Sequence, residues 1–119
     1  IDDHPFLALP EIRQLFDALR ESILELEPEA SEEFMKLYVA YRAETNFVDV
    51  VPQAKRLRLT LNLAFDEISD PRGICKDVTD IGRWGNGDVE VGLRSPDELP
   101  YVIGLVRQSL ERQLGGEDG

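Results

Sequence analysis

Residues 55–63 read Lys-Arg-Leu-Arg-Leu-Thr-Leu-Asn-Leu, and this stretch decides the fold. From position 56 onward polar and apolar residues alternate without interruption, with leucine at every odd position. Because successive side chains of a β-strand point to opposite faces, the pattern predicts a strand with one buried and one solvent-facing side. The stretch should therefore be the central strand of a sheet, and its core-facing residues should be Leu57, Leu59, Leu61 and Leu63.

A helix is expected on the N-terminal side of this strand. Pro10 should open it, because the missing N–H of proline would have no helical acceptor in the first turn anyway, and Pro28 should end it. Helical spacing relates its apolar residues, which are Ile12, Leu15, Phe16, Leu19, Ile23 and Leu26. The acidic run from Glu27 to Glu33 that follows is expected to be a solvated link, since runs of like charge usually face water.

A second helix is expected near the C-terminus. Ser95 and Glu98 fit a capping box that would begin the helix at Pro96, and Asp97 is the alternative N-cap. The apolar stripe of this helix is Leu99, Val102, Ile103, Val106 and Leu110. The two glycines at 115–116 should end it.

Three further strands are predicted from alternation or from β-branched and aromatic residues. They cover residues 34–42, 47–51 and 88–94. A helix end is the alternative for residues 35–37, a turn at 44–46 should join the first two strands, and Pro52 should close the second. The order is α-β-β-β-β-α, which predicts an α+β fold of two layers, a four-stranded antiparallel sheet with the N- and C-terminal helices on one face.

Residues 64–87 form an irregular excursion between the third and fourth of these strands. Asp70–Gly73 is expected to be a turn, residues 74–78 one or two turns of helix, and three glycines surround Trp84. Loops longer than about 12–15 residues without structure of their own are often functional. The excursion is therefore a natural place to look for a site.

The chain has the length and composition of one folded domain. Its 119 residues are 42% hydrophobic, which suits one core, and the first 9 residues and residues 115–119 are expected to be flexible. No apolar run approaches the roughly 20 residues that cross a bilayer, so we expect no membrane contact. Cys75 is the sole cysteine, which predicts a reducing, cytoplasmic location. Because the sequence begins at Ile1, we expect the domain to be part of a longer protein.

The formal net charge of −11 is unevenly distributed. Residues 42–94 carry 8 basic and 9 acidic side chains, and the acidic excess lies on either side of them. The overall field would repel a polyanion, which argues against unspecific nucleic-acid binding. A local basic patch in the nearly neutral middle is still compatible with this charge.

The polar side of the central strand is the main candidate for a ligand site. If the excursion folds over it, guanidinium groups and one indole would line a surface suited to an anion, a nucleotide or a base. The candidate ligand-binding residues are Arg42, Arg56, Arg58, Asn62, Arg72, Lys76, Arg83 and Trp84. The alternative is an ordinary charged sheet face, in which Arg56 and Arg58 pair across strands with Asp88 and Glu90.

No catalytic or metal-binding constellation is recognisable. His4 is the only histidine, and neither it nor Cys75 has an evident partner for a zinc site or an activated nucleophile. The excursion is acidic, but its spacing matches no calcium loop, and turn and cap roles suit aspartate equally well. Its acidic residues are Asp66, Glu67, Asp70, Asp77 and Asp80. We therefore predict no catalytic residue, no metal and no cofactor.

Four segments together resemble a known family. They are Phe47-Val-Asp-Val-Val-Pro, Lys55-Arg-Leu-Arg-Leu, Asp70-Pro-Arg-Gly-Ile-Cys-Lys-Asp-Val and Gly82-Arg-Trp-Gly-Asn-Gly-Asp. In this order they are similar to an uncharacterised bacterial and archaeal domain family, which occurs alone or at the end of longer proteins. Some of those proteins are related to GmrSD-type, modification-dependent restriction proteins, and others have been labelled predicted transport proteins. The resemblance implies a small α+β accessory domain without an established activity.

Three functions follow from these patterns. The first is a non-enzymatic accessory or interaction domain, which would hold a protein partner or its own neighbouring domain, with a homodimer as a further alternative. The second is local binding of nucleic acid or a small anion, with basic groups contacting phosphate and Trp84 stacking on a base. A metal-dependent nuclease is the least favoured, because no paired acid and base is present.

Overall fold

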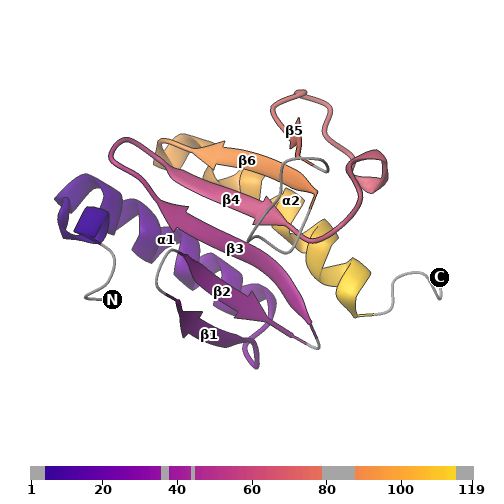
Figure 1. Cartoon of the computed structure of the whole chain (residues 1–119), viewed down its shortest axis with the longest axis horizontal. Helices are drawn as coiled ribbons and strands as arrows, with labels where there is room; N and C mark the ends of the chain where they lie inside the picture. Colours follow the sequence, from indigo (N-terminus) through magenta and orange to yellow (C-terminus); the bar gives the residue numbers. More distant parts are fainter. Residues whose placement is uncertain (1–4, 36–37, 44, 79–87, 115–119) are drawn as a thin grey trace.

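The structure, a computed structural model, describes residues 5–35, 38–43, 45–78 and 88–114. In this part of the chain a six-stranded antiparallel sheet has the strand order β1-β2-β3-β4-β6-β5 (Figure 1). The strands are β1 (Ser31–Phe34), β2 (Val39–Arg42), β3 (Asn46–Pro52), β4 (Leu57–Leu61), β5 (Lys76–Asp77) and β6 (Val89–Leu93). The predicted α+β class and antiparallel sheet are confirmed, but the described chain forms six strands instead of the four expected.

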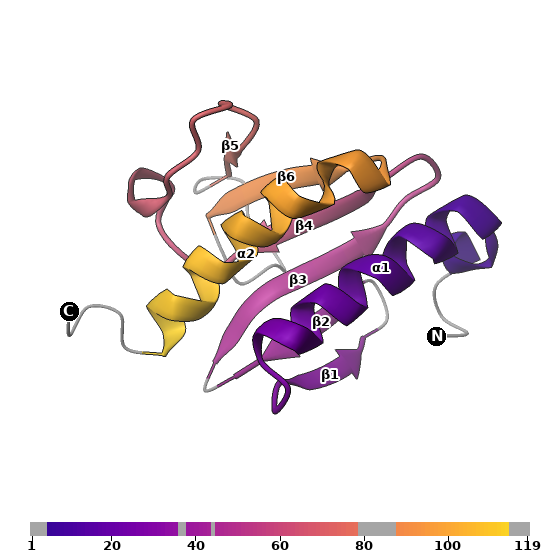
Figure 2. The same cartoon turned by 180° about the vertical axis from the view of Figure 1, so that it is seen from behind.

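Two α-helices cover one face of the sheet (Figure 2). They are α1 (Pro10–Leu26) and α2 (Leu99–Gln113), and single 3₁₀ turns lie at Pro5–Ala8, Phe65–Glu67 and Pro96–Glu98. α1 begins at Pro10 as predicted and ends before Pro28. Neither helix is long and apolar enough to cross a membrane, as far as the chain is described.

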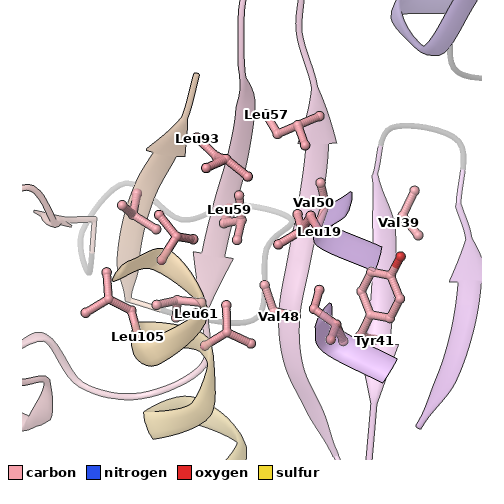
Figure 3. Packing of buried hydrophobic residues seen from close by; sticks show 14 of the residues in the cluster. Leu19, Val39, Tyr41, Val48, Val50, Leu57, Leu59, Leu61, Leu93 and Leu105 are labelled. Atoms are coloured by element: carbon pink, nitrogen blue, oxygen red, sulfur yellow. The ribbon is translucent and has the colours of Figure 1, made fainter. Parts of the chain in front are cut away.

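The leucines of β4 lie at the centre of the core (Figure 3). Leu57, Leu59 and Leu61 are completely buried, and Leu63 is 7% exposed, which confirms the predicted buried side of this strand. The strand register places Leu59 between Val50 of β3 and Val91 of β6. Since burying one leucine side chain contributes about 1.5–3 kcal/mol, this strand supplies a large share of the stabilisation.

β3 departs from simple alternation because of a bulge. The register between β2 and β3 shifts between Tyr41 and Arg42, and four successive residues from Phe47 to Val50 are buried. The Phe47 carbonyl accepts a hydrogen bond from the hydroxyl of Ser109 in α2 (2.6 Å), and the same hydroxyl accepts one from the Asn62 amide (3.1 Å). A buried serine thus satisfies backbone groups where the sheet ladder is irregular.

The predicted strand 34–42 is wrong as one element. Phe34 ends β1, the amide of Met35 donates to the Tyr38 carbonyl (2.8 Å), and Val39 begins β2, so the segment turns within itself. Phe34 contacts Phe16 of α1, with ring centroids 6.2 Å apart. Its aromatic content correctly indicated β structure, but local propensity does not show where a chain reverses.

The acidic link is also different from the prediction, because part of it is β1. Glu32 accepts a hydrogen bond from the Tyr41 hydroxyl (2.6 Å) and lies 2.8 Å from the Arg20 guanidinium, with its side chain only 13% exposed. Burial, followed by the hydrogen bond to Glu32, raises the pKa of Tyr41. Glu32 therefore faces α1 and helps to join the edge strand to the core, where the sequence predicted a solvated loop.

Two smaller expectations also change, and one residue of the lead-in is part of the core. Residues 74–78 hold the short strand β5 instead of a helical turn, and the Val78 amide donates to the Asp88 carbonyl (2.8 Å). The Ser95 side chain makes no capping hydrogen bond, while Glu98 accepts from the Arg94 amide (2.7 Å). Leu7 in the lead-in is 3% exposed and belongs to the core cluster, so this residue is held by packing.

Candidate functional site: an arginine cluster on the open face

The sheet face opposite the two helices, called the open face below, carries most of the polar strand residues. In the β4–β6 register Arg58 lies directly opposite Gly92, and Thr60 lies opposite Glu90. Paired residues of neighbouring strands point to the same side, and their neighbours Leu57, Leu59 and Leu61 are on the buried side. The polar alternation of β4 therefore produces the charged face that the sequence predicts.

Three arginines lie near one glycine of this face and are called the arginine cluster: the side chains of Arg56 and Arg94 approach Gly92, and Arg58 is its partner in the strand register. Gly92 lies at its centre. A Cβ atom at Gly92 would lie 2.9 Å from Nη1 of Arg56 and 3.4 Å from Nη1 of Arg94, so the two guanidinium groups share the space above this glycine. The missing side chain is what allows both groups to approach the backbone of β6.

Arg56 and Arg94 have only one ion-pair partner between them among the described residues. Arg56 donates from Nε to Gln53 Oε1 (2.8 Å), and its Nη2 lies 3.7 Å from the Glu90 carboxylate. For Arg94, which is exposed, the described residues provide no ion-pair partner within 4.0 Å. Two guanidinium groups near a single carboxylate leave one positive charge unbalanced. An added anion would therefore be stabilised here.

The middle of the open face is different from its arginine end. Ala40 is 2% exposed and Asp49 is 1% exposed, although neither faces the helices. Asn46 donates to the Asp49 carboxylate from its side-chain amide (2.9 Å). A buried carboxylate needs such a hydrogen-bond donor. The polar groups in this central part therefore stabilise the fold and do not form a binding surface.

The other predicted site residues are dispersed. Arg42 is exposed at the end of β2, opposite Asn46, while Lys76 on β5 pairs with Glu90 across the ladder. Asn62 donates its side-chain amide to the Asn46 carbonyl (2.9 Å), which is a structural role. Arg83 and Trp84 lie outside the described residues. Of the eight predicted residues, the structure brings Arg56 and Arg58 together with Arg94.

Arg72 belongs to a separate contact between the excursion and α2. Its guanidinium lies over the ring of Tyr101, 4.5 Å from the centroid, and its amide donates to the Tyr101 hydroxyl (3.0 Å). Tyr101 donates in turn to Asp70, which also accepts from the Cys75 amide (2.7 Å). The turn predicted at Asp70–Gly73 is present, and Gly73 has the positive φ of 66° that favours glycine.

These contacts explain two pKa shifts. Partial burial opposes ionisation of Asp70, but hydrogen bonds from Tyr101, from the amide and thiol of Cys75 and from Gly73 outweigh it, so the pKa of Asp70 is lowered. Burial, followed by the hydrogen bond to Asp70 and its charge, raises the pKa of the Cys75 thiol to about 12. A thiol with such a pKa is almost fully protonated at neutral pH and is a poor nucleophile. The protonated thiol of Cys75 can thus serve as a hydrogen-bond donor to Asp70.

The acidic residues of the excursion do not gather around one point in the described structure. Asp70 closes its turn, and Glu67 is held near Arg112 (3.3 Å). No group of three metal-ligating side chains occurs among the residues that the structure describes. The arrangement of Asp70 agrees with the turn role that the sequence favoured.

Sequence reasoning missed Arg94 and Gly92 as members of the site. The alternation of residues 88–94 puts Arg94 on the polar side of its strand, but the sequence does not show its neighbour across the sheet. Register is not visible in a single strand, and a shift by one residue would have moved it to the other face. A glycine within an otherwise alternating strand was the available signal, because such a glycine often marks a close approach.

The fold and the site define a small α+β domain with an arginine cluster on the open face of its sheet. Residues 4–112 match the model of a family described as a domain of unknown function (DUF5655), and the chain belongs to this family. This confirms the resemblance to an uncharacterised bacterial domain. The chain is also 34% identical, over 100 residues, to an uncharacterised protein of Haemophilus influenzae. The match covers 84% of this chain but 33% of that relative, so the chain spans about a third of the relative's length. No solved structure matches the chain significantly.

Proposed function

We propose that the chain is a non-enzymatic accessory domain of a longer protein, which holds an acidic segment of a neighbouring domain or partner on the arginine cluster. The observation that carries this proposal is the pair of guanidinium groups of Arg56 and Arg94 above Gly92. An ordinary charged sheet face explains Arg56, which has Gln53 and Glu90 as partners. It does not explain why a second guanidinium approaches the same glycine.

The chemistry of arginine supports a carboxylate as the bound group. The guanidinium presents planar, fixed donors that match a carboxylate, and it loses less hydration on binding than the ammonium of lysine. The length of the relative supports a role inside a larger protein, because two thirds of that protein lie outside the matched region. A neighbouring domain is thus an available partner.

The acidic character of the chain does not prevent such binding. The net charge is −11, but charges further away than about 8 Å are largely screened at physiological salt. The field that an incoming carboxylate meets is therefore that of the arginine cluster and Glu90. Binding should weaken as salt is added, because the remaining attraction is also electrostatic.

The test uses an N-acetylated, C-amidated hexaglutamate peptide with a fluorescent label, titrated by anisotropy at low and high salt. Arg56→Gln and Arg94→Gln should each weaken binding roughly tenfold, as expected for losing a hydrogen bond to a charged group. Gly92→Ala should weaken binding roughly two- to fivefold, because the added methyl displaces the Arg56 guanidinium while every charge remains.

Arg42→Gln is the matched control, because Arg42 is an exposed arginine at the opposite end of the sheet. It should leave the peptide affinity unchanged. The proposal is wrong if Arg42→Gln weakens binding as much as Arg56→Gln, or if Gly92→Ala has no effect. Either result would mean that the peptide affinity depends on the total charge of the chain and not on the arrangement of the guanidinium groups above Gly92.

Local nucleic-acid binding is the second candidate, and the grouping of three arginines favours it. Two observations argue against a continuous basic surface that could follow a nucleic-acid backbone. Arg72 lies over the ring of Tyr101, and Arg42 lies at the far end of the face. A titration of the Trp84 fluorescence with a single-stranded oligonucleotide at low and high salt separates the two candidates. Salt-sensitive quenching together with tighter binding than hexaglutamate would favour nucleic acid, since phosphate contacts release counterions.

A further inference from the structure

A cavity of about 490 Å³ lies at one end of the two-layer fold, and the proposed function makes no use of it. It is formed where the start of α1, the turn between β3 and β4 and the segment after β6 meet, and these three elements lie together at one end of the molecule in Figures 1 and 2. Its lining includes Glu11, Ile12, Leu15, Lys55 and Arg94. The volume falls within the range of small-molecule sites.

The lining divides into an apolar floor and a charged rim. Ile12 and Leu15 are each 4% exposed, so they form the floor of the cavity. Lys55 and Arg94 are exposed and lie at the rim. An apolar body on the floor would lose contact with water, while a charged group at the rim would stay hydrated on one side.

The charge of the rim selects an anion. Within the described residues, the Lys55 ammonium and the Arg94 guanidinium have no carboxylate oxygen within 4.0 Å, although Glu98 accepts a hydrogen bond from the Arg94 backbone amide, and Glu11 is the one acidic residue that lines the cavity. The cavity therefore carries one net positive charge. A monoanion balances this charge, whereas a doubly charged phosphate would exceed it.

We propose that this cavity binds a small amphiphilic carboxylate, with its hydrocarbon part on Ile12 and Leu15 and its carboxylate at Lys55 and Arg94. Arg94 connects the cavity with the arginine cluster, since its Nη1 lies near Gly92 and the residue also lines the cavity. The inference does not rest on the proposed function, because its apolar floor and Lys55 are not part of the cluster.

The test is an NMR titration of the ¹⁵N-labelled chain with hexanoate at constant ionic strength, with 1-hexanol and acetate as the matched probes. Hexanoate should give saturable shifts at the amides of Ile12, Leu15, Lys55 and Arg94. Its affinity should exceed those of 1-hexanol and acetate by roughly tenfold, because each control lacks one half of the interaction.

Variants assign the contacts. Lys55→Gln and Arg94→Gln should each weaken hexanoate binding roughly tenfold, while Arg42→Gln, at the far end of the sheet and outside the cavity lining, should change it less than about twofold. Glu11→Gln should strengthen hexanoate binding roughly two- to fivefold and leave 1-hexanol unaffected, since it removes a like charge.

Three outcomes would overturn the inference. They are the absence of saturable shifts up to about 50 mM hexanoate, equal affinity for hexanoate and 1-hexanol, and shifts that cluster away from the cavity. Arg56→Gln separates the two proposals, because it should weaken hexaglutamate binding while hexanoate binding stays unchanged. A negative result for hexanoate binding to the cavity would thus not contradict the binding of an acidic segment to the arginine cluster, and the reverse also holds.

Discussion

The central strands and the excursion are both held against α2, but by different forces. The strands contact the buried side of this helix through apolar residues such as Val102 and Leu105. The excursion contacts its outer side through polar pairs, which are Asp70 with Tyr101, Ser69 with Gln108 and Glu67 with Arg112. Apolar burial excludes water and supports the whole fold, whereas exposed polar pairs exchange with water at little cost. We therefore expect the excursion to open locally while the sheet stays folded.

The largest effect should come from the sheet side of this comparison. Leu59→Ala should lower the free energy of unfolding by about 2–5 kcal/mol, because it leaves a cavity between Val50 and Val91 in the completely buried centre. Urea denaturation followed by circular dichroism measures it. Thr60→Ala, on the opposite face of the same strand, should change the stability by no more than about 1 kcal/mol. Equal effects of the two variants would contradict the assignment of the two faces.

A smaller loss is expected where α2 meets the bulge. Ser109→Ala should cost about 1–2 kcal/mol, since the Phe47 carbonyl and the Asn62 amide both lose a buried partner. The same urea curves give this value. Gln108→Ala is the control on the adjacent helix position, because the hydrogen bonds of Gln108 within the described residues go to the backbone of Ser69 in the excursion, and it should cost less than about 0.5 kcal/mol.

A gain in stability is expected on the outer side of α2. Gly104 lies within the helix, and a Cβ atom there would meet no atom within 4 Å. Gly104→Ala should therefore stabilise the fold by about 0.5–1 kcal/mol, because alanine loses less backbone entropy in a helix. Thermal unfolding should show a raised midpoint. A lowered midpoint would mean that the excursion packs more closely against α2 than the contacts indicate.

The smallest global effect should come from the excursion itself. Asp70→Asn should change the free energy of unfolding by less than about 0.5 kcal/mol, because Asp70 is only partly buried and lies outside the hydrophobic core cluster. Hydrogen exchange should nevertheless become faster at the Cys75 amide, whose acceptor is Asp70, and stay unchanged at Leu59. Faster exchange at both positions would show that the excursion and the sheet unfold together.

The effect of pH should also distinguish the excursion from the sheet. Since the folded pKa of Asp70 lies below its ordinary value of 3.8, its contribution is complete above that value and is lost as pH falls through the lowered pKa. Acid should thus release the excursion of the natural chain below about pH 4, as read by exchange at Cys75. The Asp70→Asn variant should lack this transition, and its presence there would assign it to another group.

Some residues of the site could be predicted from the sequence, but the full set of residues that meet there could not. Arg56 and Arg58 were identifiable because they alternate with buried leucines on one strand. Arg72 was grouped with them, yet it packs on Tyr101 in a different part of the molecule. Proximity between residues far apart in the chain depends on strand register and loop path, and neither leaves a local pattern.

The sequence by itself determined the two amphipathic helices, the buried side of β4 and the antiparallel α+β class. These features follow from the periodicity of apolar residues. A spacing of about 3.6 residues places apolar side chains on one side of a helix, and a spacing of 2 residues places them on one face of a strand, where they can be buried together. Only the tertiary structure decided that the acidic link pairs as an edge strand, that the sheet has six strands in the described chain, and that Arg94 joins Arg56 above Gly92. Those outcomes depend on which segments meet in space, and polar pairing between distant residues is specified by the assembled fold, not by any local stretch of the chain.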